Sequence, residues 1–533
     1  MGNLLSNTPG EDHSSQQGVS SSGSARVAHS YIEGSYSGNI NSNNTTNIHH
    51  NYGSTSSPES CAEILQQLYT SAYESHRRRV REPVEGTCIW VTEHPKYRDW
   101  LRIKRSGLLW LSADPGCGKS VIASFLITHL KTQSDAIVCY FFFKDDSDEQ
   151  RSATFALCAI LHQLFSQRNS LCRYAERAFK EKGKRFTEEV DTLWDILIEA
   201  VAEGVCGDVI CMVDALDECE EVTLAPFIRH VNRLPGSQHS NIPLKFIVTS
   251  RPYHKIEREL GARATTIRLK GEDAVDATTA DVTRVIDDGI KELEVVWENP
   301  GGLEYLRNLL KSSADRTFLW VSLVLEILKD SEDDSQVEFT NIVSASPPDL
   351  AEFYTKILDK SAKPVKAQRI LHIVVGAARP LTLVEMNTAL TITQDHRSMR
   401  DIQRGLYRSP EKTIKSLCGL FVRIIDSKVY LVHQTAREFL IKGMLPGRGR
   451  WQYTLHAVDS NFILADICTA YLALQDFEND PLAMDALGNP GSASRKAVDN
   501  YAQKYALIDY AATHWAGHFR DSEDRQMELL EAT

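Results

Sequence analysis

The chain has 533 residues, of which 42% are hydrophobic and 24% are charged, so it has enough material for three or four folded domains. Its formal net charge of −12 argues against nucleic acid as a main partner, because a phosphate backbone is bound by a basic face. Eleven cysteines without a CxxC pair, and no apolar run near the ~18 residues of a membrane span, predict a reduced, cytoplasmic protein.

Residues 1–57 are rich in serine, asparagine and glycine, and they predict a disordered tail that cannot bury enough apolar surface to fold alone. Within this tail, Tyr31–Tyr52 combines asparagines with spaced β-formers and is able to stack as cross-β, although a flexible linker is the favoured interpretation. Met1–Ser6 fits an N-myristoylation signal at Gly2. A single acyl chain gives at most weak, reversible membrane contact.

The segment 58–100 is predicted as a helical linker, since Cys61, Ile64, Leu65 and Leu68 recur at helical spacing. It contains a basic run, Arg77–Arg79 with Arg81, which is interpreted as a solvated helix face.

Residues 101–265 alternate between short apolar runs and helical patterns. The apolar runs 108–111, 136–143, 209–213 and 246–249 predict four buried strands, with helices over 119–130 and 154–165. Continuous apolar strands separated by helices are typical of a parallel sheet covered on both faces. The sequence therefore predicts an α/β core.

Beyond residue 265 the helical patterns take over. We expect a helical domain over 266–360, with helices at 317–329 and 350–358. Helices, short strands at 421–425 and 429–431 and a further helix predict a winged-helix domain over 361–445. Residues 446–533 are predicted as a C-terminal helical segment that includes an aromatic helix at 510–519.

A P-loop lies between the first strand and the first helix of the α/β core. Its glycines let backbone N–H groups turn toward phosphates, and the helix N-terminus adds partial positive charge. Ala113 replaces the usual leading glycine, a substitution that a small residue allows. The predicted ligand is ATP or ADP with Mg²⁺, and GTP is not excluded. The predicted nucleotide-binding residues are Asp114, Pro115, Gly116, Cys117, Gly118, Lys119 and Ser120, of which Lys119 reaches the β- and γ-phosphates and Ser120 ligates Mg²⁺.

Acidic and basic residues follow the next strands. Asp214 ends an apolar strand and is predicted to hold Mg²⁺ through water. Either Asp217 or Glu218 is placed to orient or deprotonate an attacking water, the alternative being a solvated acidic loop. Arg251 ends the following strand and is predicted to contact a γ-phosphate, the alternative being an ion pair with a surface carboxylate.

Several segments together resemble a fungal NACHT domain of the STAND-type signalling ATPases and NOD-like receptors. They are the P-loop, Val213-Asp214-Ala215-Leu216-Asp217-Glu218, Thr249-Ser250-Arg251-Pro252, Gly86-Thr87-Cys88-Ile89-Trp90, Phe141–Asp146, Thr317–Val321, Arg379–Leu383 and Leu431–Leu440. The resemblance covers about residues 58–520 and implies an AAA+-like P-loop NTPase core followed by helical and winged-helix domains. It also implies that His433 of the winged helix contacts the β-phosphate of ADP, although Gln434 departs from the acidic residue of plant relatives.

The resemblance further implies a signal-transduction switch with slow hydrolysis, acting in fungal self/non-self recognition or programmed cell death. Such a switch self-associates when an unknown trigger activates it, and it engages an effector protein through the N-terminal tail. Two alternatives stay open: a turnover ATPase or kinase, and a scaffold that binds nucleotide without hydrolysing it. The intact Lys119, Ser120, Asp214 and Glu218 argue against the scaffold.

Overall fold

A computed structural model describes residues 58–532, with gaps at 146, 203–205, 235–241, 262, 270–273, 299–300, 315–316, 442–446, 448, 483–497 and 499. The predicted tail, with its cross-β and myristoylation motifs, lies outside these described residues.

The α/β core is built on a five-stranded sheet in the order β2-β3-β4-β1-β5, in which every neighbouring pair is parallel. The strands are β1 (Gly107–Ser112), β2 (Ile137–Phe142), β3 (Val209–Asp214), β4 (Leu244–Ser250) and β5 (Thr265–Arg268). The first four strands confirm the apolar runs that predicted them, since nearly every residue in them is buried. Strand β5 is less apolar and pairs at the edge beside β1, which is why its sequence carries no clear strand signal.

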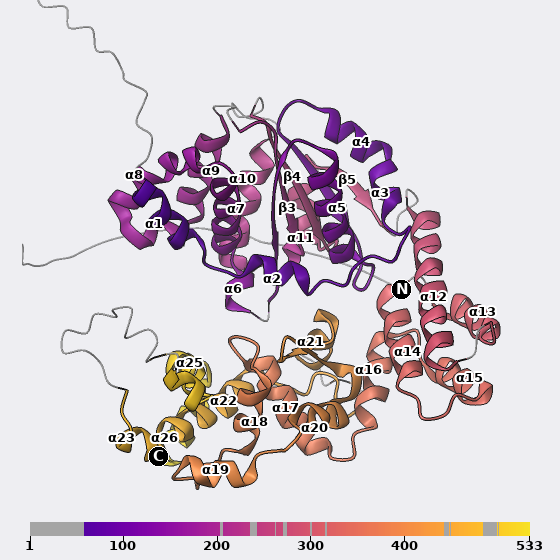
Figure 1. Cartoon of the computed structure of the whole chain (residues 1–533), viewed down its shortest axis with the longest axis vertical. Coiled ribbons are helices and arrows are strands. Elements are labelled where there is room, and N and C mark those ends of the chain that lie inside the picture. Colours follow the sequence, from indigo (N-terminus) through magenta and orange to yellow (C-terminus); the bar gives the residue numbers. More distant parts are fainter. Residues whose placement is uncertain are drawn as a thin grey trace, which may run out of the picture. The chain divides into compact units, whose positions relative to one another are not determined.

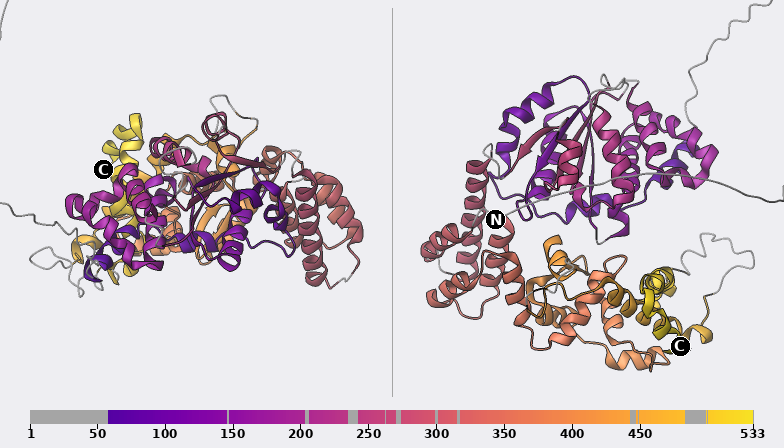
Figure 2. Two further views of the ribbon diagram at one scale, coloured as in Figure 1. Left: turned by 90° about the horizontal axis from the view of Figure 1, so that it is seen from above. Right: turned by 180° about the vertical axis from the view of Figure 1, so that it is seen from behind.

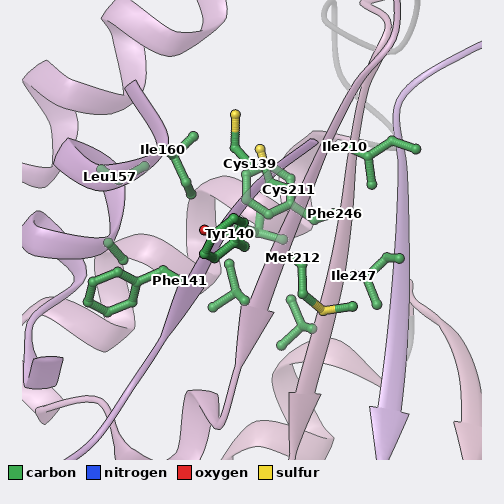
Figure 3. Packing of buried hydrophobic residues seen from close by; sticks show 14 of the residues in the cluster. Cys139, Tyr140, Phe141, Leu157, Ile160, Ile210, Cys211, Met212, Phe246 and Ile247 are labelled. Carbon is green, nitrogen blue, oxygen red and sulfur yellow. The ribbon is translucent and has the colours of Figure 1, made fainter. Parts of the chain in front are cut away.

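Helices cover both faces of this sheet (Figure 1). Helix α5 (Lys119–Gln133) packs on one face, and α7 (Ala153–Gln167), α9 (Val190–Ala202) and α10 (Glu221–Arg233) form the layer on the other. Figure 3 shows Leu157 and Ile160 of α7 beside Phe141 of β2. The contact buries apolar side chains from both layers and accounts for the mostly apolar composition of the strands.

Short helices surround the core: α1 (Pro58–Leu68), α2 (Tyr73–Arg78), α3 (Ile89–Glu93), α4 (Pro95–Arg102), α6 (Asp148–Arg151), α8 (Arg173–Lys182) and α11 (His254–Leu260). A disulfide joins Cys61 of α1 to Cys172, which corrects the expectation that all cysteines are reduced. The sequence has no signal for this pair because 111 residues separate its members. The other nine cysteines are free and buried.

The helical part contains α12 (Val275–Val296), α13 (Glu304–Ser313), α14 (Phe318–Lys329) and α15 (Gln336–Ala345), which pack side by side in Figure 2. Their shared core includes Ile286, Ile290, Leu306 and Val324. Helix α14 is apolar around most of its circumference, because its N-terminus also packs against the α/β core.

The winged-helix fold follows. Its helices are α16 (Leu350–Asp359), α17 (Pro364–Gly376), α18 (Leu383–Thr391), α19 (Met399–Gly405) and α20 (Pro410–Cys418). The antiparallel wing strands β6 (Val422–Ile425) and β7 (Lys428–Leu431) then lead into α21 (Gln434–Ile441). Asp426 and Ser427 have positive φ and make the tight turn between the two strands.

The last described helices are α22 (Ala457–Leu472), α23 (Asp476–Asn479), α25 (Ile508–Asp521) and α26 (Gln526–Ala532). In the described part of the chain, the segment Ala457–Asn479 is long and apolar enough to cross a membrane by length and composition alone. This finding corrects the expectation that the chain has no apolar run of that length. Because α22 packs against α17 and α25, the core helix of a folded domain accounts for its composition equally well.

The aromatic layer around Trp194 provides a test of this packing. Trp194 of α9 is 4% exposed, and its ring centroid lies 5.7 Å from that of Phe246 in β4 and 6.3 Å from that of Phe227 in α10. We expect Trp194→Ala to lower the free energy of unfolding by about 3–5 kcal/mol, because it leaves a large cavity. Val222→Ala, at an 84% exposed position of α10, is the control and should change it by less than about 0.5 kcal/mol in urea denaturation.

Candidate nucleotide site

The P-loop connects β1 to α5 through two residues with left-handed backbone. Gly116 has φ +73° and Gly118 has φ +79°, values that glycine adopts without steric cost. Lys119 Nζ donates to the carbonyl oxygens of Ala113 (3.0 Å) and Asp114 (3.1 Å). These bonds fold the lysine back over the loop, where its ammonium faces the space that the loop encloses.

Helix α14 packs directly on this loop. The Leu319 amide donates to the Gly116 carbonyl at 3.3 Å. A Cβ atom at position 116 would lie 2.9 Å from Leu319 Cβ, and one at position 118 would touch the Phe318 ring. The packing of the helical part therefore leaves no room for a side chain at Gly116, whereas at Gly118 it is the positive φ that favours glycine. The Thr317–Val321 motif gave a family signal in the sequence but no indication of this contact.

Asp214 lies at the carboxyl end of β3 and is 1% exposed. The Thr249 hydroxyl donates to Asp214 Oδ1 (2.5 Å) and accepts from the Ala215 amide (2.9 Å), while Ala215 takes a left-handed conformation with φ +56°. Burial raises the pKa of Asp214, and hydrogen bonds from Ser120 and Thr249 and the charge of Lys119 oppose this shift. Since Ser120 and Asp214 are adjacent oxygen donors, they fit a Mg²⁺ ion that takes its remaining ligands from phosphate and water. No group of three or more His, Cys, Asp or Glu side chains forms a metal cage within the described part of the chain.

Asp217 and Glu218 lie on the short helical turn η3 (Leu216–Glu218) and point to different places. The Asp217 side chain is 3% exposed, and its carboxylate accepts from the Arg251 backbone amide (3.0 Å) and pairs with Arg251 Nε (3.1 Å). Glu218 lines the cavity that also contains Lys119 and Ser120, whereas Asp217 does not. Of the two candidate acids, Glu218 is therefore the one that faces the phosphate-binding loop.

Arg251 joins the core to the winged helix. Its NH1 atom donates to both carboxylate oxygens of Glu438 in α21, at 2.6 and 2.8 Å, and to the Tyr253 hydroxyl at 2.9 Å. Burial acts to lower the pKa of Arg251, but the Glu438 and Asp217 carboxylates outweigh it and raise the pKa. The Arg251 side chain, 6% exposed, still lines the cavity that also contains Lys119 and Ser120 while it is paired with Glu438.

His433 follows β7 and lines the same cavity. Its Nδ1 accepts from the Thr435 amide at 3.2 Å, and the Thr435 hydroxyl, 2.9 Å from Nδ1, lies 2.7 Å from the Tyr354 hydroxyl. Because Nδ1 accepts, the neutral ring carries its proton on Nε2 and can donate it. Burial and the charges of Arg251 and Lys119 lower the pKa of His433 to about 3. Gln434, the next residue, donates to Asp145 of the core at 2.5 Å.

One polar cavity thus collects most of the predicted site. Gly116, Gly118, Lys119, Ser120, Asp214, Glu218, Arg251 and His433 line it, together with Arg79, Arg81, Lys144 and Arg423. Asp114 and Pro115 do not. Because Arg79 and Arg81 line this cavity, the interpretation of the basic run as only a solvated helix face was wrong. Lys144 and Arg423 also line it, but neither lies in a sequence motif that indicates ligand binding.

A second, mostly apolar cavity adjoins the first. It is lined by Pro83, Val84, Trp90, Val121, Ile122, Leu269, Val285 and Phe318, among others, and it shares Arg81, Cys117, Gly118, Val121, Phe318 and Ser322 with the polar cavity. Its wall is held by Asp281, which is 3% exposed and accepts from the Cys88 amide (2.7 Å) and from Arg284 (2.8 Å). An apolar cavity beside a phosphate loop has the character of a site for a base. Sequence analysis missed it because its lining comes from four separate segments.

A parallel sheet with a phosphate loop at its carboxyl edge, a strand-end aspartate and a winged-helix histidine define a P-loop NTPase with a winged-helix domain. A family model described as nephrocystin 3, N-terminal, matches residues 86–251, and one described as the winged helix domain of GPI inositol-deacylase matches residues 354–449.

The vegetative incompatibility protein HET-E-1 of Podospora anserina is 28% identical to the chain over 456 residues. The match covers 82% of this chain, which spans only 32% of the length of that curated relative. These matches confirm the resemblance that the motifs indicate: the chain is similar to the fungal NACHT-type STAND ATPases.

Two solved structures show a distant likeness. A Walker-type ATPase of Pyrococcus abyssi has a TM-score of 0.34 and 11% identity, over 68% of this chain and 98% of that one. The Drosophila ORC bound to DNA has a TM-score of 0.34 and 13% identity, over 71% and 97%. At such scores the likeness assigns no function.

The contact between the P-loop and α14 can be tested with two glycines that have the same φ. Gly116 and Gly207 both have φ +73°, but a Cβ at Gly207 would meet nothing within 4 Å. Each alanine variant should lose about 1 kcal/mol of stability from the left-handed backbone. Only Gly116→Ala also displaces the loop or Leu319, so we expect its nucleotide affinity in calorimetry to fall at least about tenfold. Equal affinities of the two variants would contradict the packing argument.

The low pKa of His433 predicts a pH dependence of stability. The folded protein holds this ring neutral down to about pH 3, whereas the unfolded chain takes up the proton near the ordinary value of 6.5. The contribution of His433 is therefore present above pH 6.5 and is lost as the pH falls from 6.5 toward 3. Between these limits the nucleotide-free protein should lose up to about 1.4 kcal/mol per pH unit relative to His433→Gln in urea titrations. The exposed His254→Gln serves as the control, and parallel pH profiles for wild type and His433→Gln would disprove the assignment.

Proposed function

We propose that the protein is a nucleotide-operated signalling switch that binds ATP or ADP with Mg²⁺ and hydrolyses ATP slowly. The observation that carries this proposal is the shared cavity: the P-loop, Asp214 and Glu218 of the core face His433 of the winged helix across one space. A ligand held by the P-loop therefore contacts both domains at once. Its chemical state can bias how they pack.

His433 would recognise the diphosphate end. A neutral imidazole with its proton on Nε2 donates a hydrogen bond to a phosphate oxygen without needing to be charged. The chain Tyr354–Thr435–His433 fixes the orientation of the ring, so this donor is held in place before the ligand binds.

In this proposal Arg251 is the residue that distinguishes ATP from ADP. In the structure its guanidinium pairs with both Asp217 and Glu438. A γ-phosphate in the cavity would compete with Glu438 for this guanidinium, because phosphate oxygens accept charge-assisted hydrogen bonds from arginine as carboxylate oxygens do. Loss of the Arg251–Glu438 pair would remove one of the contacts that hold α21 on the core. Asp217 would keep the arginine near the site.

In this proposal Glu218 is the residue that promotes hydrolysis. Its carboxylate faces the cavity and is suited to orient a water molecule, and Ser120 with Asp214 would hold Mg²⁺, which neutralises charge on the β- and γ-phosphates. Lys119 would stabilise the same phosphates. Turnover of the switch is slow, since it resets a signal and does not supply metabolic flux.

The family resemblance extends the proposal to partners. The relative is by name a vegetative incompatibility protein, and we propose a related role in fungal heterokaryon incompatibility or another innate immune response. We further propose that an unidentified trigger opens the protein in the cytoplasm, that it self-associates, and that it engages an effector protein.

A turnover ATPase or kinase is the alternative from a different class. The buried Arg251–Glu438 contact favours the switch, because it joins the site to a second domain that a simple hydrolase does not need.

The first experiment measures nucleotide content and turnover of the purified full chain, comparing wild type with Lys119→Ala, His433→Ala and the exposed control Lys415→Ala. We expect wild type and the control to retain ADP and to turn over in minutes or slower. Lys119→Ala should lose nucleotide, because the phosphates lose their main cation. His433→Ala should release ADP and self-associate in size-exclusion chromatography.

Fast multiple turnover by a monomer would favour the enzyme alternative. A wild-type protein that neither retains nor binds any nucleotide would refute the proposal as a whole.

A further inference from the structure

Arg423 lies on the wing strand β6 and lines the polar cavity from the winged-helix side. It is half-buried, yet no hydrogen bond of its guanidinium and no carboxylate within 4.0 Å is found among the residues that the structure describes. Burial lowers the pKa of Arg423, the charge of Glu326 opposes this shift, and the positive charge of Arg81 lowers the pKa further. A guanidinium in this setting is costly unless an anion approaches it.

The other cations of the cavity have partners. Lys119 donates to two P-loop carbonyls, Arg251 binds Asp217 and Glu438, and Arg79 lies 4.0 Å from Asp426 and over the Tyr430 ring. The six Lys and Arg side chains of the lining face only two carboxylates inside it, Asp214 and Glu218. The lining therefore carries more positively than negatively charged side chains, and Asp217 and Glu438 outside it offset part of this excess.

The position of Arg81 between the two cavities indicates which part of a bound nucleotide would meet the positive side chains. Arg81 is exposed and donates to the Ser322 hydroxyl at 3.1 Å, and both residues line the apolar and the polar cavities. If the base occupies the apolar cavity and the P-loop holds the terminal phosphates, the ribose and the first phosphate lie at this shared boundary. The charge of Arg81 acts on Arg423, which lies on the winged-helix side of the cavity.

We propose that Arg423 is a second ligand-binding residue of the winged helix, whose guanidinium binds the phosphate chain of the nucleotide near its ribose end, opposite Arg81. This inference rests on the proposed nucleotide function. With it, the winged helix holds the ligand at two points, His433 near the terminal phosphates and Arg423 near the ribose. The bound anion also screens the repulsion between Arg81 and Arg423, so the ligand favours the closed packing of the two domains.

This assignment predicts effects of opposite sign with and without ligand. In the full chain, Arg423→Ala should weaken ADP binding about tenfold or more in calorimetry, because a charge-assisted bond to phosphate is lost. The ADP affinity of Arg423→Lys should lie between those of wild type and Arg423→Ala, since lysine keeps the charge without the planar pair of donors. In nucleotide-free protein, Arg423→Ala should leave the melting temperature unchanged or raise it, because the repulsion from Arg81 disappears.

The matched control is Arg404→Ala, which removes an exposed arginine of the winged-helix fold that pairs with Asp401 at 3.8 Å. It should leave both measurements unchanged. Inorganic pyrophosphate is the second ligand: weaker binding of both ADP and pyrophosphate by Arg423→Ala supports contact with the phosphate chain. Weaker binding of pyrophosphate alone would mean that Arg423 binds a separate anion, and it would overturn the assignment to the nucleotide.

An affinity of Arg423→Ala for ADP within twofold of wild type would overturn the inference. A lower melting temperature without ligand, together with an unchanged ADP-induced shift, would do so as well, because it identifies a purely structural arginine. Either result leaves the nucleotide function intact if wild type binds ADP. Failure of wild type to bind ADP counts against the proposed function itself.

Discussion

The parallel pairing of β1, β3 and β4 is the constraint on which the site depends. Parallel strands have their carboxyl ends at one edge of a sheet, so the segments that follow them meet there whatever their separation in sequence. The P-loop follows β1, Asp214 ends β3 and Arg251 follows β4. An antiparallel arrangement would place one of these groups at the opposite edge. The apolar strands and the helices that cover them fit this geometry, because parallel sheets occur almost only where both faces are covered.

The Arg251 ion pairs connect this edge to the winged helix. Removing both charges from water is costly, so such a buried pair adds little net stability compared with apolar residues of the same size. Breaking it from one side is different, because the largely buried Arg251 then keeps only one of its two carboxylate partners, Asp217. The contact therefore suits a switch better than a permanent interface. It is strong while intact, and an anion that replaces Glu438 can remove it without leaving Arg251 unpaired.

The contacts around Tyr430 and Asp145 point in the same direction. Arg79 and Lys144 of the core lie over the Tyr430 ring of the wing, and Gln434 and Arg437 of α21 reach Asp145. Most of these partners are polar, half-buried and arranged around the cavity. A domain interface of this kind responds to the charge of what the cavity holds, whereas an apolar interface would not. By contrast, α14 packs on the P-loop through Phe318 and Leu319, an apolar contact that is insensitive to charge.

The sequence by itself determined the features that are local. The P-loop occupies adjacent residues whose glycines set the backbone, and the apolar strands and the wing hairpin are contiguous patterns, so each was predicted close to its observed bounds. Tertiary structure alone decided what each charged side chain meets. Glu218 lines the cavity, whereas Asp217 binds Arg251. Arg251 also binds Glu438, 187 residues away in the sequence, and Arg81 and Arg423 line the same cavity. Tertiary structure also formed the disulfide Cys61–Cys172 and the apolar cavity beside the P-loop. These contacts join segments far apart in the chain, and a single sequence contains no local backbone preference that could predict them.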